Sequence, residues 1–225
     1  MVALITGANR GIGLAFCQLL TARGDEVIAV CRASSDELGR LAVQVGERLR
    51  VIEGVDVSHE EGAAHLVQSL GDRPIDLLIN NAGIMASVTL ENLDIASIRE
   101  QFEINAIAPL RITHALLGQL SDHAKVAIVT SRMGSIDDND SGGSYGYRMS
   151  KVAANMAGRS LSVDLKGRGI AVALLHPGWV RTDMTGGNGL IDAEQSASGL
   201  ITIMDRLTLD QTGLFWHTNG EILPW

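Results

Sequence analysis

The chain has few of the features that mark secreted or membrane-spanning proteins. Its 225 residues include only two cysteines, Cys17 and Cys31, which lack the close spacing of a redox or metal motif and are typical of reduced thiols. No apolar run reaches the length of a transmembrane helix. The first apolar run begins at Val2, which leaves no room for a secretory leader before it. These absences together predict a cytoplasmic protein.

Positive charge is also scarce. Eighteen Lys and Arg residues stand against 26 Asp and Glu residues, which gives a net charge of −8. So acidic a chain has no general attraction for nucleic acid or for anionic membranes. Metal-ligand spacing is missing too, because the acidic run 137–140 lacks the glycine and glutamate that complete a calcium loop. We therefore expect no metal, nucleic-acid or membrane partner, and any bound anion must be held by a few local groups.

What the chain does contain is a regular alternation of apolar runs and helical patterns. The runs expected to form strands cover residues 2–5, 26–31, 49–55, 75–79, 124–130 and 170–175, and residues 213–225 could add one more. Such alternation predicts one α/β domain over residues 1–225: a Rossmann-type, doubly wound parallel sheet of about seven strands with helices on both faces. The glycine-rich segments 134–144 and 182–192 follow strand ends, where such sheets bind ligands.

Three glycines follow the first apolar run and open the first helical pattern. Gly7 can adopt backbone angles that other residues resist, Gly11 leaves space for a pyrophosphate, and Gly13 lets helix and strand pack closely. The helix would then offer free N–H groups to an anion. The spacing is one residue wider than the common dinucleotide fingerprint. On this motif alone, a glycine turn that binds nothing stays open as an alternative.

Tyr147 and Lys151 stand four residues apart in the helical pattern 147–165, so both project from one face. A nearby ammonium lowers the pKa of a phenol from about 10, which would fit Tyr147 for acid-base chemistry. The alternative is an ordinary surface pair. Ser131, at the end of the fifth run, is placed to hydrogen-bond a substrate carbonyl, with Ser135 as its rival. His176 lacks a carboxylate partner, and we interpret it as a satisfied histidine at a strand end.

Taken together, these motifs resemble the short-chain dehydrogenase/reductase family over nearly the whole chain. Residues 6–13 are similar to the family's cofactor loop and residues 80–83 to its Asn-Asn-Ala-Gly segment. Residues 56–57 resemble its adenine contact, and residues 177–182 its Pro-Gly-x-x-x-Thr segment. Within the family, residues 131–151 and the final Leu-Pro-Trp look like sniffer-type carbonyl reductases and C-factor-like proteins.

The resemblance implies a catalytic tetrad of Asn105, Ser131, Tyr147 and Lys151. It implies that Asn105 distorts the helical pattern 94–118 and holds a water that links Lys151 to solvent. The gap of sixteen residues between Ser131 and Tyr147 is longer than in many family members, and segment 137–144 would absorb the difference.

The resemblance also implies a nicotinamide cofactor. The second strand ends in Cys31 and Arg32 rather than in an acidic residue, and Arg32 with Arg10 could clamp a 2′-phosphate, so we predict NADPH over NADH. Asn81 either ties neighbouring strands together or touches the nicotinamide. The predicted cofactor-binding residues are Gly7, Asn9, Arg10, Gly11, Ile12, Gly13, Arg32, Asp56, Val57, Asn81, Ala82, Gly83, Tyr147, Lys151, Pro177, Val180 and Thr182.

These features predict an NADPH-dependent carbonyl reductase that acts on aldehydes or ketones, with Tyr147 as the general acid. Four large side chains are candidates for an apolar substrate pocket, or else for the core or an interface: Met85, Met133, Trp179 and Met184. The alternative function is a nucleotide-sensing, C-factor-like signalling protein with little turnover. The resemblance suggests a homodimer or homotetramer formed through the helical patterns 94–118 and 147–165.

Overall fold

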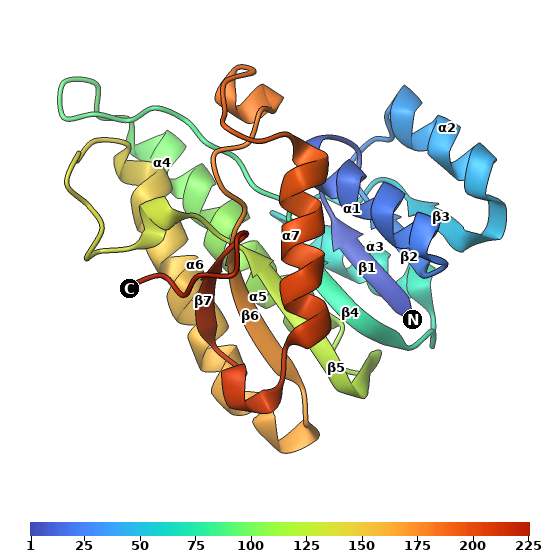
Figure 1. Cartoon of the computed structure of the whole chain (residues 1–225). Helices are drawn as coiled ribbons and strands as arrows, with labels where there is room; N and C mark the ends of the chain where they lie inside the picture. The colour runs from blue at the N-terminus through green and yellow to red at the C-terminus, as the bar shows by residue number, and fades with distance from the viewer.

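A single seven-stranded parallel sheet forms the centre of the molecule, in the order β3-β2-β1-β4-β5-β6-β7 (Figure 1). This computed structural model describes residues 1–225. The strands are β1 (Val2–Thr6), β2 (Glu26–Val30), β3 (Leu49–Ile52), β4 (Ile75–Asn80), β5 (Leu120–Val129), β6 (Ala171–His176) and β7 (Leu214–His217). The predicted doubly wound sheet is confirmed, and the expected last strand is β7.

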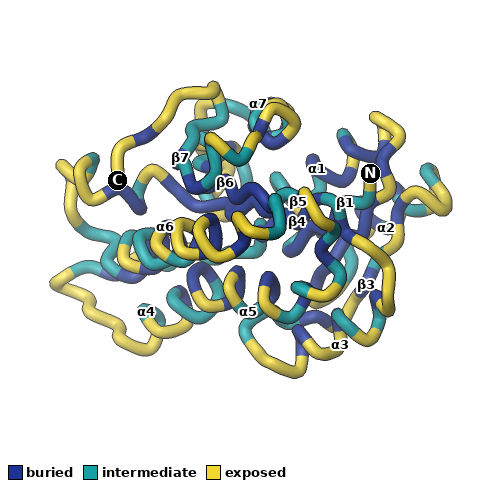
Figure 2. The backbone as a smooth tube through the Cα atoms, turned by 90° about the horizontal axis from the view of Figure 1, so that it is seen from below, coloured by how far each residue is buried: buried dark blue, intermediate teal, exposed yellow.

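Helices cover both faces of the sheet (Figures 1 and 2). One layer consists of α1 (Gly11–Arg23), α2 (Asp36–Val45) and α7 (Ala193–Arg206). The other consists of α3 (Glu60–Leu70), α4 (Ile95–Phe102), α5 (Ala108–Ala115) and α6 (Tyr145–Asp164). Each layer closes one apolar core: in β1, Ile5 faces the first core and Leu4 the second. Burial on both faces explains why the strands read as continuous apolar runs rather than as alternating ones.

Several element boundaries differ from the sequence pattern, and the expected strand 49–55 already ends at Ile52. Strand β5 begins at Leu120 rather than at Ala124, with a register shift against β4 and a left-handed φ of 66° at His123. Polar residues at the start of β5 conceal it from a hydrophobic pattern. The expected helix 94–118 is divided by a π-helical turn over Glu103–Ile107 and ends at Ala115.

The order of the sheet defines where a ligand can bind. From β1 the chain builds outward to β2 and β3 on one side, and β4 to β7 follow on the other. Parallel sheets of this kind have a crevice at the carboxyl ends of the strands where the order reverses. The glycine turn after β1 and the segment after β4 meet there. Separately, none of the helices is long and apolar enough to cross a membrane.

Candidate active site

The turn between β1 and α1 depends on the absence of side chains. Gly7 and Gly11 have φ values of 66° and 53°, in the left-handed region. A Cβ atom on Gly13 would lie 2.1 Å from the carbonyl oxygen of Gly7, and one on Gly7 would lie 2.9 Å from Cα of Ala82. Glycine is therefore required for α1 to pack against the end of β1 and for the segment after β4 to approach the same turn.

The N-terminus of α1 is free to bind an anion. Arg10 occupies the N-cap position without making a side-chain capping hydrogen bond, and the first turn of the helix carries no acidic residue. The first N–H groups of this helix therefore have no partner within it. Thr182, in the segment after β6, lies over the same turn, because a Cβ atom on Gly11 would be 3.5 Å from its Cγ2. This cradle fits a pyrophosphate group.

Asn81 ties β4 to β1. Its Nδ2 donates to the carbonyl oxygens of Thr6 and Gly7 at 3.0 and 3.2 Å. The Thr6 hydroxyl accepts hydrogen bonds from the backbone N–H groups of Asn81 and Ala82 at 3.0 and 3.1 Å. Of the two roles considered for the Asn81 side chain, the structure supports the tie between strands. The sequence pattern gave Thr6 no such role, and only its place at the end of a strand hints at it.

Ser131 and Tyr147 form the centre of the site. Ser131 directly precedes the 3-10 turn η3 (Arg132–Gly134), whereas Tyr147 lies in the first turn of α6. Both are buried, and the Ser131 hydroxyl lies close enough to act on the pKa of the Tyr147 phenol. Burial raises the pKa of Tyr147, and the Ser131 hydroxyl opposes that rise. Each of the rival serines also accepts a backbone hydrogen bond: Ser135 from the N–H of Asp138 at 3.1 Å, and Ser131 from the N–H of Met133 at 3.2 Å.

Lys151 lies beside the tyrosine ring. Its Nζ is 5.6 Å from the ring centroid of Tyr147 and donates to the carbonyl oxygen of Val129 at 2.9 Å. Burial lowers the pKa of Lys151 from its ordinary value of 10.5 to about 8. The sequence-based expectation that Lys151 lowers the pKa of Tyr147 differs from the structure, in which the net direction is upward because desolvation of the phenol dominates.

Asn105 occupies the π-helical turn between α4 and α5, which confirms the predicted distortion of this helix. Its Oδ1 accepts a hydrogen bond from the N–H of Ile84 at 2.9 Å, and its Nδ2 donates to the carbonyl oxygen of Ile84 at 2.9 Å. A Cβ atom on Gly83 would lie 3.1 Å from Oδ1 of Asn105 and 3.6 Å from Nζ of Lys151. Gly83 therefore adjoins both side chains, and the four predicted tetrad residues gather at one end of α6.

Two arginines lie at the outer edge of the cradle. Nη1 of Arg10 is 3.3 Å from Oδ2 of Asp183, an ion pair that the sequence did not suggest. Arg32 is exposed and lies two residues after the end of β2. Asp56 accepts hydrogen bonds from the backbone and the hydroxyl of Ser58, and these bonds lower its pKa, with a smaller contribution from the charge of Arg32. The ends of β2 and β3 thus place Arg32 near Asp56.

All the predicted cofactor residues lie at the carboxyl edge of the sheet or on the first turns of α6. Val180 is buried and pairs with Ile191, while Pro177 accepts a hydrogen bond from Ser196 at 2.7 Å. The predicted cofactor residues that follow strand ends are Gly7 and Asn9 to Gly13 after β1, Arg32 after β2, Asp56 and Val57 after β3, Asn81 to Gly83 after β4, and Pro177, Val180 and Thr182 after β6.

His176 corrects one prediction. It lies at the end of β6 and packs edge-on against His217 of β7, with 5.0 Å between the ring centroids. Its Nδ1 is buried and has no hydrogen-bond partner in the protein. The sequence pattern predicts that the hydrogen-bonding groups of this ring are paired, and for Nδ1 that prediction is wrong. Burial, together with the neighbouring His217, lowers its pKa to about 3 and keeps the ring neutral.

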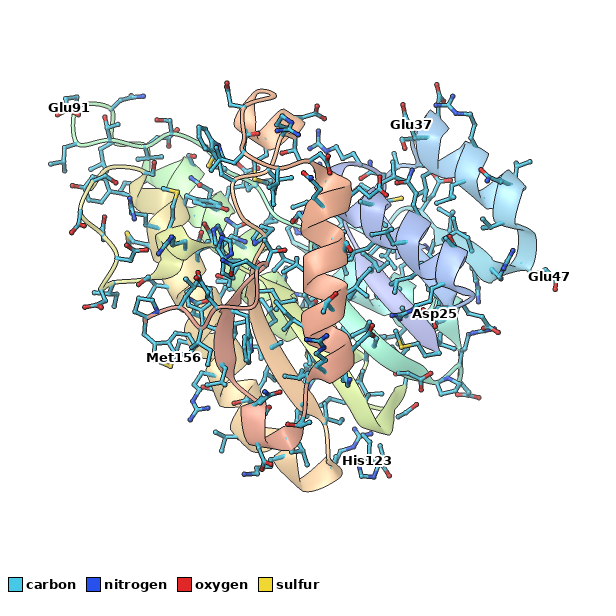
Figure 3. All side chains as sticks on the ribbon, viewed as in Figure 1. Asp25, Glu37, Glu47, Glu91, His123 and Met156 are labelled. Atoms are coloured by element: carbon cyan, nitrogen blue, oxygen red, sulfur yellow. The ribbon has the colours of Figure 1, made fainter.

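The candidate substrate-pocket residues are not core residues. Met85, Trp179 and Met184 are 41%, 55% and 43% exposed. Met133 lines a cavity of about 260 Å³ between α6 and the loop that precedes it. Figure 3 shows Glu91 at the outer end of the long segment that joins β4 to α4. Three of the four candidate side chains are therefore exposed, on segments that follow strand ends.

Comparison with known proteins places this geometry in context. A sequence model described as short chain dehydrogenase matches residues 1–190. The chain is 41% identical over 228 residues to 1-hydroxy-2-glutathionyl-2-methyl-3-butene dehydrogenase of Rhodococcus sp., which covers 99% of this chain and 98% of that protein. It is 46% identical over 155 residues to the C-signal of Myxococcus xanthus, covering 68% of this chain and 93% of that protein.

A solved structure is similar over the whole chain. The crystal structure of NADPH-bound carbonyl reductase from chicken fatty liver superposes with a TM-score of 0.89 at 32% sequence identity, and the match covers 100% of this chain and 98% of that chain.

Proposed function

Because this chain belongs to the short-chain dehydrogenase family of oxidoreductases, we propose that it is an NADPH-dependent carbonyl reductase that reduces aldehydes or ketones. The observation that carries the proposal is the buried group of Ser131, Tyr147 and Lys151, in which Nζ of Lys151 lies 5.6 Å from the centroid of the tyrosine ring. The likeness to an NADPH-bound carbonyl reductase supports the same cofactor and reaction.

The two hydroxyl groups suit a carbonyl oxygen. In the proposed reaction the substrate oxygen accepts hydrogen bonds from Ser131 and Tyr147, and Tyr147 donates its proton as negative charge develops on that oxygen. A raised pKa keeps the phenol protonated at neutral pH, which is the form that a reduction requires. When bound, the nicotinamide supplies the hydride.

Lys151 and Asn105 support the proton donor. At neutral pH a lysine with a pKa of about 8 is mostly charged, so its ammonium group stabilises negative charge that remains on Tyr147 after proton transfer. We propose that Lys151 also holds the ribose next to the nicotinamide. The position of Asn105 near Lys151, on either side of Gly83, supports a role for Asn105 in returning a proton from solvent.

The cradle fits a phosphorylated dinucleotide. Gly7, Gly11 and Gly13, together with the uncapped N-terminus of α1, would hold the pyrophosphate. Arg32 stands where the adenine ribose of such cofactors lies, at the end of the second strand, and would bind the 2′-phosphate with help from Arg10. The absence of an acidic residue at that strand end favours NADPH over NADH.

The chain also carries an exposed apolar face suited to self-association. Ile107 and Leu110 on the π-helical turn and α5, and Met156 and Val163 on α6, are each 43% to 66% exposed. Figure 3 shows Met156 at the outer side of α6. We propose that these helices form a homodimer or homotetramer. Sedimentation of the wild-type protein and of Met156→Glu tests this, since the variant should shift toward monomer.

The sequence identity with C-signal supports a second candidate function, that of a signalling protein of the same fold with little turnover. Oxidation of NADPH, followed by its absorbance with a panel of aromatic aldehydes, aliphatic ketones and dicarbonyl compounds, separates the two. A reductase turns over several of these compounds. Tight NADPH binding without turnover of any of them would favour the signalling candidate.

A further inference from the structure

Ser150 lies between Tyr147 and Lys151 in α6 and has no exposed surface. Its hydroxyl donates to the backbone carbonyl oxygen of Tyr147 at 2.8 Å. The Oγ atom of Ser150 also accepts a hydrogen bond from Nδ2 of Asn105 at 3.0 Å. Ser150 is therefore the one group in direct contact both with the catalytic helix at Tyr147 and with the side chain of Asn105.

The direction of every hydrogen bond in this network is fixed. A carbonyl oxygen only accepts, so the single hydroxyl proton of Ser150 points to Tyr147 and its oxygen must accept from Asn105. The N–H of Ile84 likewise requires the oxygen of the Asn105 amide to face it. The two protons on Nδ2 are then assigned, one to the carbonyl oxygen of Ile84 and one to Ser150.

We propose that Ser150 is a positioning residue, which holds the Asn105 amide in a single orientation and links the π-helical turn to the backbone of Tyr147. This inference rests on the proposed function. Asn105 is 1% exposed, so removal of the Ser150 oxygen leaves one buried Nδ2 proton without its protein partner. Only the two hydrogen bonds to Ile84 then hold the amide, so Asn105 is held less firmly beside Gly83 and Lys151.

The chain provides a matched control on the same helix. Ser162 is also buried, and its hydroxyl donates to the carbonyl oxygen of Arg159, three residues earlier, at 2.6 Å. Ser150 makes the same bond to the residue three positions before it. The replacement of either serine by alanine removes one such local bond, but only Ser150 accepts a hydrogen bond from Asn105.

The test compares Ser150→Ala and Ser162→Ala in the full-length protein. We expect Ser150→Ala to lower kcat for carbonyl reduction by about tenfold or more, the equivalent of one lost buried hydrogen bond. Its Kd for NADPH and its thermal unfolding midpoint should match those of Ser162→Ala, which should keep kcat within about twofold of the wild type. Equal kcat values for the two variants would overturn the proposal.

A double variant shows whether Ser150 acts through Asn105. In the Asn105→Ala background, Ser150→Ala should lower kcat no further, because the Asn105 amide that Ser150 would hold is already absent. An unreduced, tenfold effect in that background would contradict the proposed role.

A second readout does not depend on turnover. Protection of the Asn105 side-chain amide protons from hydrogen exchange should be lost in Ser150→Ala and kept in Ser162→Ala. If the wild type turns over no carbonyl compound, the proposed function is wrong, but this inference is not yet contradicted. Retained protection of the Asn105 amide protons in Ser150→Ala would contradict the inference itself.

Discussion

Arg10 and Asp183 form an ion pair across the entrance of the cofactor cradle, with 3.3 Å between Nη1 and Oδ2. The side chains are 67% and 79% exposed. Exposed pairs of this kind contribute little free energy, so a phosphate group can compete for the guanidinium. Arg10 nevertheless has a partner within the protein, whereas no ion pair engages Arg32. Arg32 should therefore carry more of the discrimination between cofactors.

The first prediction concerns this arginine. Arg32→Ala should raise the Kd for NADPH by about tenfold and leave the Kd for NADH nearly unchanged, since only NADPH carries the 2′-phosphate. Addition of Cys31→Asp should reverse the preference, because an acidic side chain there binds the free 2′-hydroxyl. Fluorescence titration with both cofactors measures this, and Arg40→Ala, on the exposed side of α2, serves as the control. Equal catalytic efficiency of the unmodified protein with NADPH and NADH would refute this role for Arg32.

The second prediction follows from the lowered pKa of Lys151. Between the folded-state value of about 8 and the ordinary value of 10.5, the unfolded chain holds the proton and the folded protein releases it. Stability therefore rises with pH in this window, by up to about 1.4 kcal/mol per pH unit. Urea unfolding of the wild type and of Lys151→Met across this window should show the wild type gaining stability relative to the variant. A constant difference would show that Lys151 titrates normally.

The third prediction separates a structural glycine from a tolerant one. Gly13→Ala places a methyl group 2.1 Å from the carbonyl oxygen of Gly7 and 2.7 Å from Nδ2 of Asn81, so we expect a loss of stability of about 2 kcal/mol or more together with weaker NADPH binding. Gly39→Ala in α2 is the control, because a Cβ atom there meets nothing within 4 Å. That variant should be stabilised by about 0.5–1 kcal/mol. Similar unfolding midpoints for the two variants would contradict the packing argument.

The sheet could be predicted from the sequence because its signal is simple. Strands buried on both faces read as apolar runs, and each crossover helix carries its own periodic pattern. The start of β5 escaped the prediction, because Ser121 to His123 are polar and His123 takes a left-handed conformation. Such a strand start depends on pairing with β4, which no local pattern contains.

The site could be predicted only in part. Spacing placed Tyr147 and Lys151 on one helix face, and the glycines marked the cradle. The roles of Ser150 and Thr6 depend on hydrogen bonds to residues 45 and 75 positions away in the sequence, so composition and periodicity gave no sign of them. The direction of the Tyr147 pKa was wrong for a related reason: proximity to a lysine can be read from spacing, but the degree of burial of the phenol cannot.

The fourth prediction concerns the range of substrates. Trp179 and Met184 are exposed at the carboxyl edge, and the segment after Thr182 reaches α7 within about ten residues, so the site should be open. An open apolar rim accepts varied ligands, since methionine side chains repack readily. Several aldehydes and ketones should therefore have kcat/KM values within about a hundredfold of one another. Turnover of one compound, with no reaction of its near analogues, would rule out an open pocket.

The central claim is that Tyr147 donates the proton in carbonyl reduction, and one substitution tests it most directly. Tyr147→Phe keeps the packing of the ring but removes the hydroxyl that lies beside Ser131. NADPH oxidation with the best carbonyl substrate should fall by about a thousandfold or more, while the Kd for NADPH stays within about twofold of the wild type. Turnover by Tyr147→Phe equal to that of the wild type would contradict the account.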